Sequence, residues 1–122
     1  MLKKSVMEKF KIVFMITDNK KWDILFSHID NLLLKTNIVD TIEVVITDTA
    51  ILSTLKQCSS SNISLFILRL YQKNVMFWLC GNTLKKYNFS PDAIMPHIKI
   101  TYDGGIIKIL ELRANGYYLF EN

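Results

Sequence analysis

The feature that most constrains the fold is a short apolar run from Val75 to Leu79, which holds one β-branched and two aromatic residues. A run this apolar and too short for a helix indicates a strand buried on both faces, as in the middle of a parallel sheet. The run ends at Cys80 and Gly81, and Asn82 is the expected N-cap of a short helix that follows. We therefore expect the Cys80 thiol at the carboxyl end of a central strand, the edge where ligands bind in open α/β sheets.

Similar apolar runs alternate with amphipathic segments along the whole chain. Five strands are predicted, over residues 10–16, 41–46, 75–79, 98–102 and 117–120. Helical spacing or capping residues predict helices over residues 22–34, 48–55, 63–72, 83–87 and 103–115. This order predicts a three-layer α/β/α sandwich with a five-stranded, mainly parallel sheet. Asn74 and Gly116 stand where helices end, and a left-handed residue is favoured at such positions.

Length and composition predict one globular domain over residues 1–122, with residues 1–8 as a flexible arm and a serine-rich flexible loop over residues 57–62. The net charge of +4 comes mostly from scattered lysines, so we expect no nucleic-acid partner. No secretion signal and no apolar run of membrane-spanning length is present, and two cysteines are too few for a disulfide framework. These features predict a cytoplasmic protein with no membrane partner.

Several short motifs resemble the DsrE/DsrF-like family of small sulfur-relay proteins. The first is Cys-Gly-Asn-Thr-Leu at residues 80–84, followed by a helix start at Gly105-Ile106 and by Gly-Tyr-Tyr at residues 116–118. Residues 26–33 and the Glu-Val-Val of residues 43–45 are also similar. The resemblance spans nearly the whole chain. It implies five parallel strands between helices and assembly as a homotrimer or homohexamer.

The resemblance also implies a role for Cys80, which would accept a sulfane sulfur as a persulfide and pass it to a partner. The donor and acceptor would be proteins or small thiols. Many members of the family are uncharacterised, so the activity stays open. The chain departs from the family pattern at His28, Asp48, Asn74 and Arg113. Asp48 matters most, because a carboxylate near Cys80 would raise the pKa of the thiol.

Sulfur transfer needs a thiolate, and a helix N-terminus favours one through its free N–H groups and partial positive charge. We expect Gly81, Asn82 and Thr83 to support a thiolate at Cys80. Five further residues are expected to line a pocket beside it: Asp18, His28, Asp48, Gly104 and Gly105.

Other interpretations of the same residues remain open. Cys80 is an inert core cysteine in one of them, because free cysteine is among the most buried residue types. The chain would then be a non-catalytic assembly or regulatory protein with the same fold. Small-ligand binding at the same edge is a third alternative. Cys58 is either a bystander or a thiol that resolves the persulfide. The cysteines and histidines match no zinc-ligand spacing, and no nucleotide-binding glycine motif occurs, so we expect neither a metal nor a cofactor.

Overall fold

The computed structural model describes residues 8–58 and 61–122. Its centre is one sheet of five strands: β1 (Phe10–Ile16), β2 (Val39–Ile46), β3 (Met76–Cys80), β4 (Lys99–Thr101) and β5 (Tyr117–Glu121). The strand order is β4-β3-β2-β1-β5, and every neighbouring pair is parallel. The predicted five-stranded parallel sheet is confirmed, and β3 lies inside it between β2 and β4.

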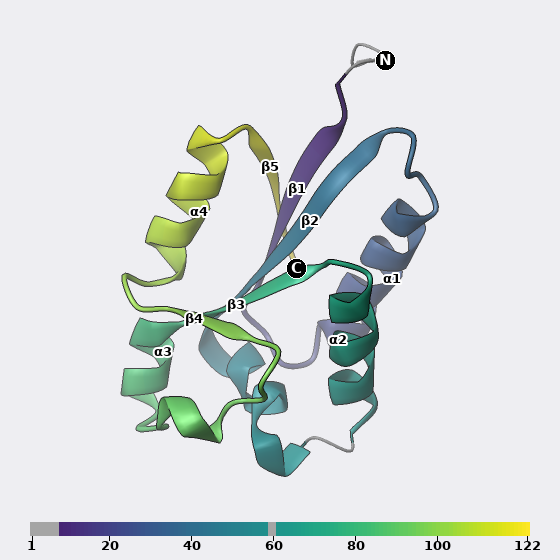
Figure 1. Ribbon diagram of the computed structural model, residues 1–122. Coiled ribbons are helices and arrows are strands. Elements are labelled where there is room, and N and C mark those ends of the chain that lie inside the picture. The colour runs from purple at the N-terminus through teal and green to yellow at the C-terminus, as the bar shows by residue number, and fades with distance from the viewer. Residues whose placement is uncertain (1–7, 59–60) are drawn as a thin grey trace.

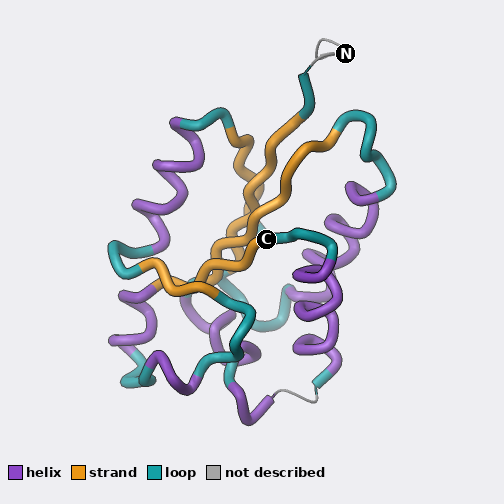
Figure 2. Tube along the Cα trace, in the orientation of Figure 1, coloured by secondary structure: helices purple, strands orange, loops and turns teal. Residues whose placement is uncertain are grey.

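Helices lie on both faces of this sheet, which confirms the three-layer arrangement. Helices α1 (Trp22–Leu33) and α2 (Asn62–Gln72) lie on one side, and α4 (Gly105–Ala114) lies on the other (Figures 1 and 2). A short helix, α3 (Gly81–Lys86), follows β3 directly. Three 3₁₀ helices complete the connections: η1 (Asp48–Thr54), η2 (Lys56–Cys58) and η3 (Pro91–Ala93). No helix in residues 8–58 or 61–122 is long and apolar enough to cross a bilayer.

The two faces of the sheet bury separate groups of side chains. The larger cluster lies under α1 and α2 and includes Phe14, Phe77 and Leu79, whereas the smaller one lies under α4 and includes Val45 and Ile109. Successive side chains of a strand point to opposite faces. Since Phe77 and Leu79 face the larger cluster, the side chain between them and the side chain that ends β3 face α4. The cysteine at the end of β3 therefore lies on the α4 side.

Local backbone features agree with most of the predicted boundaries. Asn74 and Gly116 have φ values of 69° and 89°, which confirms the left-handed residues expected after two helices. Part of the predicted loop over residues 57–62 is helical instead, because η2 includes Cys58 and α2 begins at Asn62. Residues 59–60 of that loop and residues 1–7 of the predicted arm lie outside the described residues.

Candidate functional site

The site forms where β3 passes into α3 without a connecting loop. Cys80 ends the strand and also occupies the N-cap position of α3, which begins at Gly81. The prediction that Asn82 is the N-cap is therefore wrong, because the helix starts one residue earlier and Asn82 lies within its first turn. Glycine at position 81 permits this start: a Cβ there would lie 3.0 Å from the carbonyl oxygen of Thr101 and 3.1 Å from the Cα of Tyr102.

Hydrogen-bond donors from two helices converge on the sulfur of Cys80. The backbone N–H of Gly105, the first residue of α4, donates to Cys80 Sγ at 3.2 Å. From α3, the hydroxyl of Thr83 and the backbone N–H groups of Asn82 and Thr83 also hydrogen-bond the sulfur. The amino end of each helix offers backbone N–H groups without a partner inside the helix. The chain thus directs two such ends at one sulfur atom.

These donors decide the ionisation of the thiol. Burial raises the pKa of Cys80, because it disfavours the charged thiolate. The hydrogen bonds from Thr83, Gly105 and Asn82 act in the opposite direction and outweigh burial, so the pKa of Cys80 lies below its ordinary value. Cys80 keeps only 7% of its surface exposed. It is therefore a largely enclosed thiol whose surroundings favour the thiolate.

Asp48 contributes to this site through its backbone rather than its carboxylate. Its N–H donates to the hydroxyl oxygen of Thr83 at 3.3 Å, which leaves the hydroxyl hydrogen for the sulfur. Asp48 has a φ of 51°, a left-handed conformation that glycine adopts readily and aspartate tolerates. The Asp48 carboxylate is not among the groups that shift the pKa of Cys80, and the net shift is downward.

Two glycines allow α4 to approach the sulfur. Gly104 has a φ of 98°, and a Cβ on it would lie 2.5 Å from Asn82 Nδ2. A Cβ on Gly105 would lie 2.8 Å from Thr47 Cγ2. Any larger residue at either position would push the start of α4 away from β3. Gly105 thus lies against Cys80, and Gly104 lies against Asn82 next to it.

Asp18 and His28 were also predicted for this pocket. Asp18 follows β1, which β2 separates from β3, and its Oδ1 accepts the backbone N–H of Lys20 at 2.8 Å. His28 lies on α1, on the opposite face of the sheet from Cys80, where its ring stacks on Phe14 with centroids 6.3 Å apart. The prediction that His28 shares a pocket with Cys80 is wrong, because α1 lies on the opposite face of the sheet. The prediction for Asp18 remains a prediction.

The second cysteine is also separate from the first. Cys58 is half-buried in η2, where it packs against the larger core cluster and its thiol donates to the carbonyl oxygen of Leu52 at 3.7 Å. The larger cluster lies on the face of the sheet opposite the Cys80 side chain. Within the described part of the chain, no three His, Cys, Asp or Glu side chains gather as a metal ion would require.

Sequence reasoning missed two parts of the molecule. Thr47 is buried against the position where a Cβ of Gly105 would lie, so it limits what can occupy that position. An apolar cavity under α1 is lined by two alternate residues of β5, Tyr118 and Phe120, and by Asn122, which follows the strand. The alternation of aromatic residues in the last strand was the available signal, because residues two apart share one face.

Comparison with known proteins identifies the fold. No protein-family model and no curated protein sequence matches the chain. Two solved structures have a similar fold. Protein MTH1491 from Methanobacterium thermoautotrophicum, described as of unknown function, is 22% identical with a TM-score of 0.82 over 93% of this chain and 100% of its own. The ychN protein from E. coli is 12% identical with a TM-score of 0.70 over the same shares. The chain therefore shares its α/β fold with these two proteins, and this fold agrees with the resemblance to the DsrE/DsrF-like family.

Proposed function

We propose that this protein is a sulfur carrier that accepts sulfane sulfur on Cys80 and relays it to a partner. One observation carries the proposal: the Cys80 sulfur accepts hydrogen bonds from Gly105, Asn82 and Thr83, which together lower its pKa. A thiolate is the nucleophile in sulfur transfer, and a lowered pKa raises its population at neutral pH. The DsrE-like fold agrees with this role.

Transfer of sulfane sulfur from a persulfide donor to Cys80 requires no external oxidant. The Cys80 thiolate attacks the outer sulfur of a donor persulfide, R–S–SH, and forms a new S–S bond. The S–S bond of the donor breaks, and the donor leaves as the thiolate R–S⁻. The outer sulfur keeps its proton or releases it to water, since a persulfide is more acidic than a thiol. In the second step an acceptor thiolate attacks the same outer sulfur and regenerates the Cys80 thiolate.

The hydrogen-bond donors around Cys80 stabilise its thiolate both as the attacking nucleophile and as the leaving group. The Gly105 N–H and the Thr83 hydroxyl stabilise negative charge on sulfur before attack and again when Cys80 leaves. Because Cys80 is only 7% exposed, the site favours a donor that presents its outer sulfur on a narrow or extended group. Small persulfides and a flexible cysteine-bearing segment of a protein both meet this requirement.

Intact-mass measurement tests the proposal. After incubation with glutathione persulfide and removal of excess reagent, wild-type protein should gain the mass of one sulfur atom, and reduction should remove it. Cys80→Ser should gain none, whereas the matched variant Cys58→Ser should load as the wild type does. Equal loading of Cys80→Ser and wild type would remove Cys80 from the mechanism.

The second candidate function is a non-catalytic assembly or regulatory role. The enclosure of Cys80 favours it, and so does an exposed apolar face on α4, where Ile106 and Leu110 are 62% and 58% exposed. These two residues are four positions apart and share one side of the helix. We propose that this face supports assembly into a homotrimer or homohexamer. A Cys80 thiol that resists iodoacetamide in the folded protein across the neutral range would favour the non-catalytic role.

A further inference from the structure

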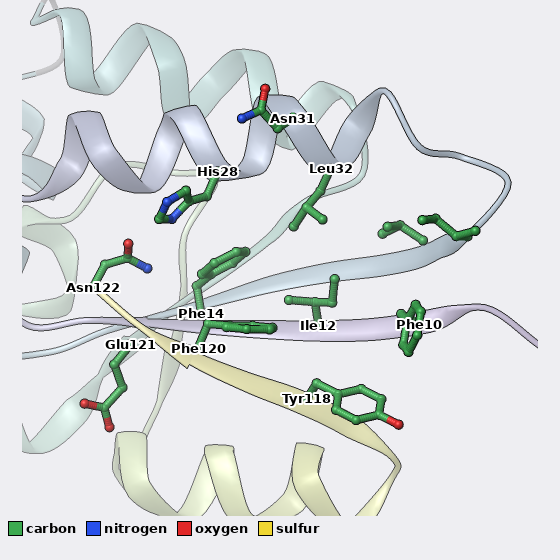
Figure 3. Close-up of a pocket in the computed structure, with 12 residues that line it drawn as sticks. Phe10, Ile12, Phe14, His28, Asn31, Leu32, Tyr118, Phe120, Glu121 and Asn122 are labelled. Carbon is green, nitrogen blue, oxygen red and sulfur yellow. The ribbon is translucent and has the colours of Figure 1, made fainter. Parts of the chain in front are cut away.

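A cavity of about 640 Å³ lies between α1 and the edge of the sheet formed by β1 and β5 (Figure 3). It is on the face opposite the Cys80 side chain, so it is separate from the proposed sulfur site. Ligand pockets in proteins are mostly apolar hollows of roughly 300–1,000 Å³ with a few well-placed polar groups. The size of this cavity falls within that range.

The walls of the cavity are largely aromatic. The rings of Phe14 and Phe120 have centroids 5.8 Å apart, and those of Phe10 and Tyr118 have centroids 5.4 Å apart. Leu32 closes the cavity from α1 (Figure 3). Phe120 and Tyr118 are still 52% and 41% exposed, so water contacts apolar ring surface there. A flat apolar ligand would remove this surface from water, which is favourable.

One end of the cavity is polar. The side chains of His28 and Asn122 lie at this end, and the amide nitrogen of Asn122 is directed toward Phe14 (Figure 3). This nitrogen is buried and has no hydrogen-bond partner within the part of the chain that the structure describes. A buried donor without a partner is uncommon, because leaving it unsatisfied is unfavourable. An acceptor atom of a ligand would satisfy it.

We propose that this cavity binds a small aromatic molecule with a hydrogen-bond acceptor at one end, such as an arene carboxylate. The ring system lies along Phe14 and Phe120, and the acceptor lies against Asn122 Nδ2 and the imidazole of His28. Glu121 also lines the cavity, but its carboxylate points away from the aromatic rings (Figure 3). The proposal does not depend on sulfur chemistry at Cys80.

A small molecule fits these features better than a second copy of the chain. A protein surface that filled the hollow would need a protruding aromatic side chain with its own acceptor beyond the ring. An arene carboxylate combines both in one rigid body. Its loss of conformational freedom on binding is small, because few of its bonds rotate.

Titration with 2-naphthoate, followed by two-dimensional ¹H–¹⁵N NMR, tests the proposal. Saturable shifts of the Asn122 side-chain amide and of the backbone amides around His28 and Phe120 are expected. Leu32→Trp fills the cavity and should weaken binding at least tenfold. The matched variant Leu65→Trp, on the exposed surface of α2, should bind as the wild type does. Shifts confined to other residues, or equal binding by Leu32→Trp, would overturn the proposal.

A second variant tests the polar end and does not disturb the core. Asn122→Leu keeps the size of the side chain and removes the donor. It should bind 2-naphthoate about tenfold more weakly, which is the loss expected for one hydrogen bond to a charged acceptor. Its affinity for 2-methylnaphthalene, which has no acceptor, should not change. Equal affinity of Asn122→Leu and wild type for 2-naphthoate would overturn the role given to Asn122. Absent binding together with dissociation of an oligomer in Leu32→Trp would assign the cavity to a second copy and overturn the proposal.

Discussion

At the scale of single residues, the ionisation of Cys80 depends on a short series of hydrogen bonds. The Asp48 N–H donates to the Thr83 hydroxyl, and that hydroxyl hydrogen-bonds the sulfur. Gly105 adds a backbone donor from a different helix. No base is needed in this arrangement. Asp48 contributes its backbone N–H, whereas Thr83 contributes a side-chain hydroxyl, so side-chain substitutions at Thr83 should have a larger effect than those at Asp48.

Replacement of Thr83 by valine tests the hydroxyl. Thr83→Val keeps the shape of the side chain and removes a donor to the thiolate, so the pKa of Cys80 should rise. The loss of a hydrogen bond to a charged group disfavours the thiolate, which sets the direction of this change. The pH midpoint of the iodoacetamide reaction rate, measured in a Cys58→Ser background, reports the pKa. Thr36→Val, at an exposed position after α1, serves as the control and should leave the midpoint unchanged.

The lowered pKa also makes stability depend on pH. The folded protein releases the Cys80 proton at a lower pH than the unfolded chain does. Between these two pKa values the unfolded state binds more protons, so the contribution of Cys80 to stability grows as pH rises and is complete above the unfolded pKa. It is lost as pH falls through the folded pKa. The difference in unfolding free energy between wild type and Cys80→Ala, measured by urea titration under reducing conditions, should therefore increase with pH. A difference that is flat or falls with pH would contradict a stabilised thiolate.

The sequence predicted the position of Cys80 but not the whole site. A short apolar run that ends in Cys-Gly was enough to place the thiol at the sheet edge. The error at His28 has a structural cause: a sequence pattern places a helix beside the sheet but does not say which face of the sheet that helix covers. Strand order comes from long-range pairing, which local patterns do not encode. The hydrogen bond from the Asp48 N–H to Thr83 was also not predictable, because the sequence does not show that Asp48 adopts a left-handed conformation.

At the scale of elements, the approach of α4 to β3 determines the site. The helix carries an N–H to the sulfur because Gly104 and Gly105 leave room for Asn82 and Thr47. The strands and most helices were predictable because their periodicities differ, with alternation in strands and spacing of three to four in helices. The first and last residues of these helices and strands were harder to predict. The start of α3 at Gly81 depends on close contact with Thr101, which is distant in sequence.

Gly105→Ala tests this approach. The added Cβ would lie 2.8 Å from Thr47 Cγ2, so α4 must shift away from β3. We expect a loss of about 1–3 kcal/mol in unfolding free energy, as for other overpacked sites. We also expect a rise in the pKa of Cys80, because the N–H donor moves with the helix. Thermal or urea unfolding measures the first effect and iodoacetamide kinetics measure the second.

Two variants separate packing from backbone effects at Gly105. Gly116→Ala introduces a Cβ with no atom within 4 Å at a φ of 89°, so it should cost only backbone strain of about 1 kcal/mol and leave the thiol pKa unchanged. Thr47→Ser removes the methyl group that a Cβ at Gly105 would meet. The double variant Thr47→Ser/Gly105→Ala should recover part of the lost stability. No recovery would show that the methyl contact is not the cause.

At the scale of the whole molecule, apolar surface remains exposed on both sides of the sheet. One region is the aromatic cavity under α1, and the other is the outer face of α4 with Ile106 and Leu110. Contiguous apolar patches on a protein surface mark sites of interaction. The two regions differ in shape, since one is a hollow with a polar end and the other is a convex helix face. A hollow suits a small ligand, and a helix face suits another copy of the chain.

A substitution on the exposed face of α4 therefore tests whether the protein assembles through this face. Leu110→Lys places a charge at the centre of this face and changes helix propensity little, so the fold should remain while association weakens. Sedimentation velocity should show wild type as a trimer or hexamer and Leu110→Lys shifted toward the monomer. Leu65→Lys makes the same substitution at an exposed position of α2 and should retain the oligomeric state of the wild type. Because Cys80 faces the same layer as α4, dissociation should also change the rate at which iodoacetamide reaches the thiol. A monomeric wild type would contradict the assembly, whereas the thiolate argument, which depends on donors within one chain, would be unaffected.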